Sequence, residues 1–214
     1  MRPEFSAGTR SGRLLIFLRL ILAPFALGAI TVLGFAPFQF YFLPPVTLTA
    51  LLLIWLRCHT FRATVAVGFA FGAGLFLVGV SWVYVSLHVY GGMAMPVAAL
   101  FTVLFCLIQA CYPALACAIL QRLRANTPVR LMLLFPALWA ISEWMRSFLL
   151  SGFPWLSIGY SQVPASALAG YAPVLGVYGV SLVTVAIAGA AASAIDGFFL
   201  RRSGPDPEIG RAHV

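Results

Sequence analysis

Residues 95–120 read MPVAALFTVLFCLIQACYPALACAIL and contain no charged side chain. A helix needs about 20 mainly apolar residues to cross the roughly 30 Å hydrocarbon core of a bilayer. This stretch meets that length, and apolar runs recur on both sides of it. The sequence therefore predicts an all-α, polytopic transmembrane helix bundle of about six helices, with spans at residues 14–34, 40–57, 63–87, 95–120, 129–150 and 174–199.

The composition of the whole chain agrees with a lipid environment. Of 214 residues, 62% are hydrophobic and 8% are charged, whereas about a quarter of the residues in a soluble domain are charged. We expect one transmembrane domain at residues 1–202 and a polar tail at 203–214. The pair Gly68 and Gly72, together with the small residues at 189–194, predicts close packing of helices.

The positions of the arginines predict the orientation of the bundle. Loops that carry arginine alternate with the loops at 35–40, 88–94 and 151–173, which carry none. Because basic loops stay in the cytoplasm, both ends of the chain are predicted to be cytoplasmic. Such scattered charges do not form the basic stripe of a nucleic-acid-binding protein, so no nucleic-acid partner is expected. The arginines that flank the predicted spans are Arg2, Arg10, Arg13, Arg19, Arg57, Arg62, Arg122, Arg124, Arg130, Arg201 and Arg202.

The outer loops are rich in aromatic side chains, among them Trp82, Tyr84, Trp155 and Tyr160. Aromatic residues at this depth commonly anchor helices at the membrane interface, and an outward-facing polar-aromatic site is the alternative. His88 fits an interfacial hydrogen-bonding anchor better than a catalytic base. Residues 151–173 are long and rich in Pro, Gly and Ser, which predicts a re-entrant or surface-lying segment that needs protein neighbours.

Glu143 and Arg146 are the charges that lie well inside an apolar span. Three residues apart, they share a helical face and can pair. An ionisable pair within the membrane is a candidate functional site that would contact a lipid headgroup or a substrate. The alternative is an internal salt bridge that fixes helix packing.

No catalytic constellation or metal site is complete in the sequence. His88 and Asp196 lie on opposite sides of the predicted membrane, and no HExxH, P-loop or GxSxG motif occurs. The cysteines form no close CxxC pair, which favours buried apolar side chains over a disulfide or zinc site. They are Cys58, Cys106, Cys111 and Cys117.

Several motifs, in order over roughly residues 20–200, resemble one family. They are FAPF at 35–38, GVSWVYVSL at 79–87, PALW at 136–139, EWMR at 143–146, GFPW at 152–155, GYSQ at 159–162 and LGVYG at 175–179. This set resembles the membrane region of apolipoprotein N-acyltransferase.

The resemblance implies a multi-pass enzyme of the bacterial inner membrane that uses no cofactor. Its partners are a phospholipid acyl donor and a diacylglyceryl lipoprotein acceptor, whose N-terminal amine receives the acyl chain. The family acts through an acyl-thioester on a Cys activated by Glu and Lys in a nitrilase-like domain. The resemblance also implies that the lipid entrance is lined by Trp82, Tyr84, His88, Glu143, Arg146, Trp155 and Tyr160.

Residues 1–214 contain no lysine, so we expect a fragment that supplies the membrane scaffold and lipid entrance and is inactive alone. No catalytic residue is carried over. Residues 209–214, IGRAHV, can be encoded by a common sequencing adapter, which suggests that the natural gene continues. The alternatives are a non-catalytic lipid-binding scaffold that partners a separate catalytic domain, and a small transporter, although no related halves are seen.

The predicted orientation places Trp155 outside the cell membrane and Arg122 in the cytoplasm. Each can be replaced by cysteine in a background that lacks the four native cysteines. A membrane-impermeant maleimide added to intact spheroplasts should then label the Trp155→Cys variant and spare the Arg122→Cys variant. Labelling of both from one side would contradict the predicted arrangement.

Overall fold

The computed structural model describes residues 18–149, 152–164 and 166–202, with only the backbone of Arg19 and of residues 200–202. The start of the predicted first span and the predicted tail at 203–214, with its adapter-like end, lie outside these residues. The described part of the chain is helical and contains no strand, which confirms the all-α class. Three of its helices are long and apolar enough to cross a membrane, namely Phe61–Gly79, Met95–Arg122 and Ala167–Phe199.

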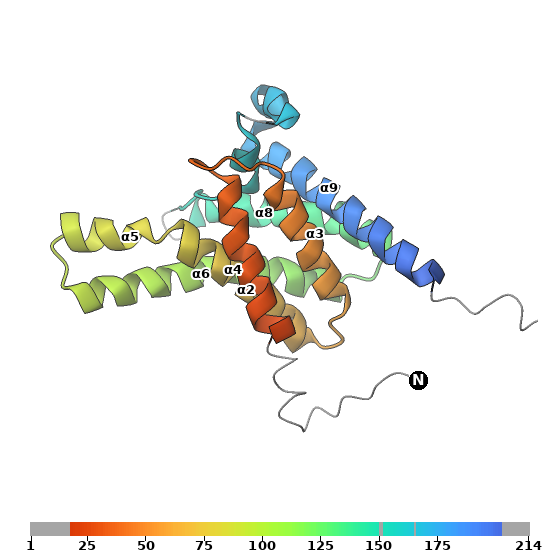
Figure 1. The fold of residues 1–214 in the computed structure, drawn as a ribbon, viewed down its shortest axis with the longest axis horizontal. Helices are drawn as coiled ribbons and strands as arrows, with labels where there is room; N and C mark the ends of the chain where they lie inside the picture. Colours follow the sequence, from red (N-terminus) through yellow and green to blue (C-terminus); the bar gives the residue numbers. More distant parts are fainter. Residues whose placement is uncertain (1–17, 150–151, 165, 203–214) are drawn as a thin grey trace, which may run out of the picture.

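The described first half of the chain contains four longer helices, which Figure 1 shows together with the short α5. The chain begins with three elements that follow one another directly: the short π-helix η1 (Leu18–Leu22), α2 (Ala23–Thr31) and the 3₁₀ helix η2 (Val32–Gly34). Helix α3 (Leu43–Leu56) then returns beside α2. Next come α4 (Phe61–Gly79), the short α5 (Trp82–Val85) with η3 (Ser86–Tyr90), and α6 (Met95–Arg122). Because α2 and α3 are apolar but short, the six-span count stays a prediction.

The second half consists of two long helical stretches joined by an irregular segment. The turns α7 (Thr127–Val129) and η4 (Arg130–Leu134) lead into α8 (Phe135–Arg146). Two 3₁₀ turns follow, η6 (Ile158–Gln162) and η7 (Ala167–Tyr171), before α9 (Ala172–Arg202). Helix α9 is interrupted at Gly176, whose φ of 63° lies in the left-handed region that glycine tolerates.

The helix expected at 63–87 is broken in the structure. Helix α4 ends at Gly79, Val80 leaves the helical conformation with φ −120° and ψ 10°, and a new helix starts at Trp82. A Cβ on Gly79 would lie 2.5 Å from Leu156 Cδ1, so the end of α4 directly abuts the segment after α8. Beyond the break, α5 and η3 extend away from the bundle beside the start of α6 (Figure 1).

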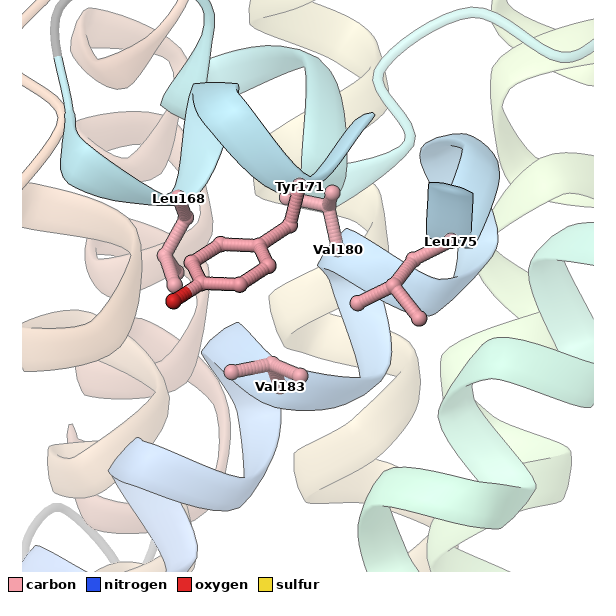
Figure 2. Close-up of a pocket in the computed structure, with 5 residues that line it drawn as sticks. All are labelled: Leu168, Tyr171, Leu175, Val180 and Val183. Atoms are coloured by element: carbon pink, nitrogen blue, oxygen red, sulfur yellow. The ribbon is translucent and has the colours of Figure 1, made fainter. Parts of the chain in front are cut away.

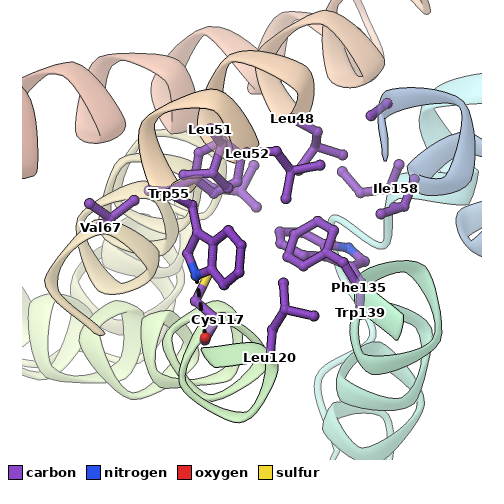
Figure 3. Packing of buried hydrophobic residues seen from close by; sticks show 14 of the residues in the cluster. Leu48, Leu51, Leu52, Trp55, Val67, Cys117, Leu120, Phe135, Trp139 and Ile158 are labelled. Atoms are coloured by element: carbon purple, nitrogen blue, oxygen red, sulfur yellow. Dashed lines mark hydrogen bonds between the residues drawn. The ribbon is translucent and has the colours of Figure 1, made fainter. Parts of the chain in front are cut away.

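The core joins side chains from α3, α4, α6, α8 and the segment after α8 (Figure 3). The indole of Trp55 is 2% exposed and donates a hydrogen bond from Nε1 to the carbonyl of Cys117, at 3.4 Å. The rings of Phe135 and Trp139 pack at 5.6 Å between centroids. The other labelled members of this cluster are Leu48, Leu51, Leu52, Val67, Leu120 and Ile158.

Close backbone contact around α4 depends on small residues. A Cβ on Gly28 of α2 would lie 2.0 Å from the carbonyl oxygen of Phe71, and one on Gly74 would lie 2.0 Å from that of Phe25. On the opposite face, Gly72 meets Ala110 of α6. Lipid supplies no hydrophobic drive between helices, so such van der Waals contact must hold them together.

We predict that Gly74→Ala destabilises the bundle by about 1–3 kcal/mol, because the added methyl group would displace the α2 backbone. The matched control is Gly197→Ala in α9, where an added Cβ meets nothing within 4 Å. Unfolding of the purified variants in detergent measures the difference. Equal stability of the two variants would show that α2 and α4 can separate without cost.

Candidate functional site

A pocket of about 460 Å³ opens where α4 ends. Trp82 and Trp155 form one wall, with ring centroids 5.7 Å apart, and Phe153 stacks on Trp155 at 5.6 Å. Trp82 is 42% exposed and Trp155 is 53% exposed, so the wall is open to a ligand. The pocket is lined by Phe35, Ala36, Gly79, Trp82, Pro154, Trp155, Leu156, Tyr160 and Val163.

The chemistry of this lining suits binding and not a reaction. Its side chains are aromatic or aliphatic, and Tyr160 contributes the one hydroxyl group. No acid, imidazole or thiol lies among these lining residues, so a nucleophile and its base would have to come from elsewhere. Within the described ranges, no group of three or more His, Cys, Asp or Glu side chains could hold a metal ion.

Glu143 and Arg146 lie beneath the pocket and hold its floor in place. Both are 3% exposed, and neither belongs to the lining. Arg146 donates from Nη1 to the carbonyls of Phe153, at 2.9 Å, and of Trp155. Its Nη2 lies 3.4 Å from the hydroxyl of Ser157.

Glu143 binds the same segment, residues 153–158, at its C-terminal end. Its Oε1 accepts from the backbone N–H of Ile158 at 2.8 Å and from Trp139 Nε1 at 2.8 Å. The bonds of Arg146 go to Phe153, Trp155 and Ser157, whereas Glu143 Oε1 binds Trp139 and Ile158. None of these hydrogen bonds joins Glu143 to Arg146. We refer to Glu143 and Arg146, with their bonds to residues 153–158, as the α8 clamp.

The α8 clamp surrounds a residue in an unfavourable backbone conformation. Leu156 has φ 60°, in the left-handed region that residues with a Cβ rarely adopt. Such a conformation persists only where neighbouring contacts impose it. Here Trp155, Ser157 and Ile158 are all bound by α8, and the Leu156 side chain packs against Gly79.

The rest of the irregular segment is tied to the other helices. The N–H of Gly159 donates to the hydroxyl of Ser181 in α9, at 2.7 Å, and Gln162 Nε2 donates to the carbonyl of Tyr41, at 2.9 Å. The segment predicted to be re-entrant or surface-lying therefore has protein partners for its backbone.

The structure brings three of the predicted site residues together, namely Trp82, Trp155 and Tyr160. Tyr84 and His88 lie outside the pocket on α5 and η3, with ring centroids 5.5 Å apart. His88 Nδ1 lies 2.8 Å from the carbonyl oxygen of Met93, which closes the turn before α6.

Sequence reasoning missed several lining residues, among them Phe35, Gly79 and Leu156. The motif at 35–38 was available as a signal, because it stands in a loop predicted to be outer and contributes Phe35 and Ala36. Gly79 opens the motif at 79–87, but no local pattern marks it or Leu156 as part of a pocket, because α4 ends at Gly79 only in the folded chain.

A second hollow, of about 280 Å³, lies between η7 and α9 (Figure 2). Its labelled side chains are apolar apart from the Tyr171 hydroxyl, which points away from Leu175. None of these side chains is charged, so the hollow has no group that could bind an ion or act as an acid or base. The lining residues are Leu168, Tyr171, Leu175, Val180 and Val183.

We predict that Arg146→Met loosens residues 153–158, because the carbonyls of Phe153 and Trp155 lose a buried donor at about 1–3 kcal/mol each. Amide hydrogen exchange of this segment should become faster, and Arg146→Lys should give an intermediate rate. The control is Arg122→Met, since Arg122 is exposed and distant in the fold. Exchange as slow in Arg146→Met as in the unaltered protein would disprove the clamp.

Comparisons with known proteins agree with the membrane region identified from the motifs. Residues 27–190 match the family described as apolipoprotein N-acyltransferase N-terminal domain. The apolipoprotein N-acyltransferase of Nitrosomonas europaea is 50% identical over 164 residues, which cover 76% of this chain and 33% of that protein.

Two further relatives carry the same name. The protein of Coxiella burnetii is 42% identical over 165 residues, covering 76% of this chain and 33% of its own length. That of Chromobacterium violaceum is 36% identical over 208 residues, covering 97% of this chain and 38% of its own. The chain thus spans about a third of the length of these relatives. It belongs to the apolipoprotein N-acyltransferase family, of which it contains the N-terminal, membrane-embedded domain.

Proposed function

We propose that this chain is the membrane scaffold of an apolipoprotein N-acyltransferase and that its aromatic pocket is the entrance for lipid substrates. In the proposed reaction, an acyl ester bond of a phospholipid breaks and an amide bond forms at the N-terminal amine of a diacylglyceryl-cysteine lipoprotein. The lysophospholipid leaves as an alcohol, whose oxygen takes up the proton that the amine loses. The proposed location is the bacterial inner membrane, with the pocket on the outer side. The single observation that carries the proposal is the open Trp82–Trp155 wall over an apolar pocket.

The size and lining of the pocket support a lipid ligand. A volume of about 460 Å³ lies within the roughly 300–1,000 Å³ range of small-molecule sites. Each methylene group taken from water into such a site contributes about 0.8 kcal/mol. Aromatic rings that are apolar on their faces and polar at one edge suit the junction between acyl chain and headgroup.

In this proposal the residues of the candidate site have different roles. Trp82, Trp155 and Tyr160 contact the lipid, whereas Glu143 and Arg146 are positioning residues that hold Trp155 through its backbone. Tyr84 and His88 shape the turn before α6 at the edge of the entrance. The acyl-carrying Cys and its Glu and Lys partners are supplied from outside residues 1–214, which contain no lysine.

We predict that Trp155→Ala and Trp82→Ala each weaken binding of a fluorescent diacylglyceryl-cysteine lipopeptide by about five- to tenfold, since each removes an aromatic contact of about 1 kcal/mol or more. The control is Trp144→Ala in α8, because Trp144 is also 53% exposed but lies outside the pocket. Binding is measured by fluorescence anisotropy on the purified chain in nanodiscs. An equal loss in the Trp144→Ala variant would point to general interfacial partitioning and overturn the entrance assignment.

Acyl transfer itself can be tested with a phospholipid labelled in its acyl chain. Purified residues 1–214 should yield no labelled lipopeptide, because the pocket lacks a nucleophile. Turnover by this chain alone would contradict the proposal that the reacting groups lie elsewhere.

A further inference from the structure

The opposite end of α4 carries a different surface from the aromatic pocket. A groove of about 480 Å³ runs over the start of this helix and the neighbouring η1. Its walls are apolar, and Phe61 and Ile21 are 42% and 37% exposed. The lining residues are Ile21, Phe61, Arg62, Val65, Ala66 and Phe69.

Two arginines stand at this groove. Arg62 is exposed and belongs to the lining, and the guanidinium of Arg122 lies 4.5 Å from the centre of the Phe61 ring. The stacking of Arg122 on Phe61 holds a positive charge beside the apolar groove without burying it. The groove therefore combines a hydrophobic trough with two cations at one end.

No carboxylate among the described residues neutralises this pair of cations. The acidic side chains in the described ranges are Glu143, which is buried in the α8 clamp, and Asp196 in α9. Neither belongs to η1, α4 or α6, the elements that form the groove and hold Arg122. Among residues 18–149, 152–164 and 166–202, the elements at this groove thus offer positive charge alone, which is complementary to an anionic ligand.

We propose that this groove binds one anionic phospholipid of the cytoplasmic leaflet, with an acyl chain along Val65 and Phe69 and its phosphate between Arg62 and Arg122. A free phosphate would leave the apolar trough empty, and a zwitterionic lipid would bring its own ammonium group next to the two cations. Basic pockets beside transmembrane helices on the cytoplasmic side commonly bind anionic headgroups. The predicted cytoplasmic position of Arg62 and Arg122 agrees with this leaflet.

The bound lipid is distinct from the proposed substrate. The groove lies at the N-terminal end of α4, whereas Gly79 at the C-terminal end lines the aromatic pocket. This site has no neighbouring acid, thiol or imidazole in its lining, so its lipid would stabilise the contact of η1 with α4 and would not react.

The test uses phosphatidylglycerol with a photoactivatable diazirine in its acyl chain, added to the purified chain in phosphatidylcholine nanodiscs. After illumination, the cross-linked residues are mapped by mass spectrometry. We expect labelling within residues 61–69, and we expect unlabelled phosphatidylglycerol to compete better than phosphatidylcholine. Equal competition by the two lipids, or labelling that avoids residues 61–69, would overturn the proposal.

Charge variants test the arginines separately from the trough. Arg62→Gln and Arg122→Gln should each weaken phosphatidylglycerol binding about fivefold, the factor that corresponds to about 1 kcal/mol per arginine near an anionic headgroup. The matched controls, Arg57→Gln and Arg124→Gln, remove the same charge from arginines that neither line the groove nor stack on Phe61, and they should retain the labelling. Equal losses in variants and controls would mean a general surface attraction and would disprove a defined site. If a variant fails to fold, the lipid competition on the unaltered chain decides.

Discussion

The structure depends on hydrogen-bond partners for the backbone of an irregular segment, in a bundle that buries few charged side chains. Residues 152–163 follow α8 without forming a regular helix until η6, so their N–H and C=O groups need partners that lipid cannot supply. Arg146 and Glu143 supply several of them from one face of α8, and Ser181 and the Tyr41 carbonyl bind the polar groups that follow. Trp155, the wall of the pocket, is held through its own carbonyl. The shape of the candidate site is thus a consequence of hydrogen bonding below it.

Helix α4 links this site to the rest of the molecule. Its small residues allow α2 and α6 to approach from two sides, and its two ends carry contrasting surfaces. Phe61 at the start lies under Arg122, whereas Gly79 at the end meets Leu156 and the aromatic wall. A change in the packing of α4 would therefore alter both the pocket and the basic groove, although no ligand contacts the middle of the helix in either proposal.

The helical class and the ranges of α3 and α6 could be predicted from sequence, because long apolar runs between arginines leave little alternative. Trp82, Trp155 and Tyr160 could be predicted as one site from their shared place in loops predicted to be outer. The break after Gly79 could not, since residues 79–87 contain neither a charged residue nor a proline, and the end of α4 lies against Leu156, which is distant in sequence. For the same reason Tyr84 and His88 were expected in the entrance, whereas the arm of α5 and η3 carries them outside the pocket.

Charged side chains inside a membrane domain are expected to mark a substrate path, because burying them is costly. Here the geometry gives Glu143 and Arg146 a different use. A guanidinium offers several donors in one plane, so Arg146 alone reaches two carbonyls and a hydroxyl that no single neutral side chain could serve. An arginine so placed needs a compensating negative charge nearby, and Glu143 supplies it one helical turn away while accepting from Ile158. The pair can thus hold a strained turn at Leu156 while the aromatic side chains above it remain exposed, as the proposed lipid entrance requires. The floor of the pocket is rigid because Glu143 and Arg146 are buried, whereas its wall is open because the Trp155 side chain is exposed. Residues 153–158 can meet both requirements because their backbone binds the buried pair while the Trp155 side chain faces the pocket.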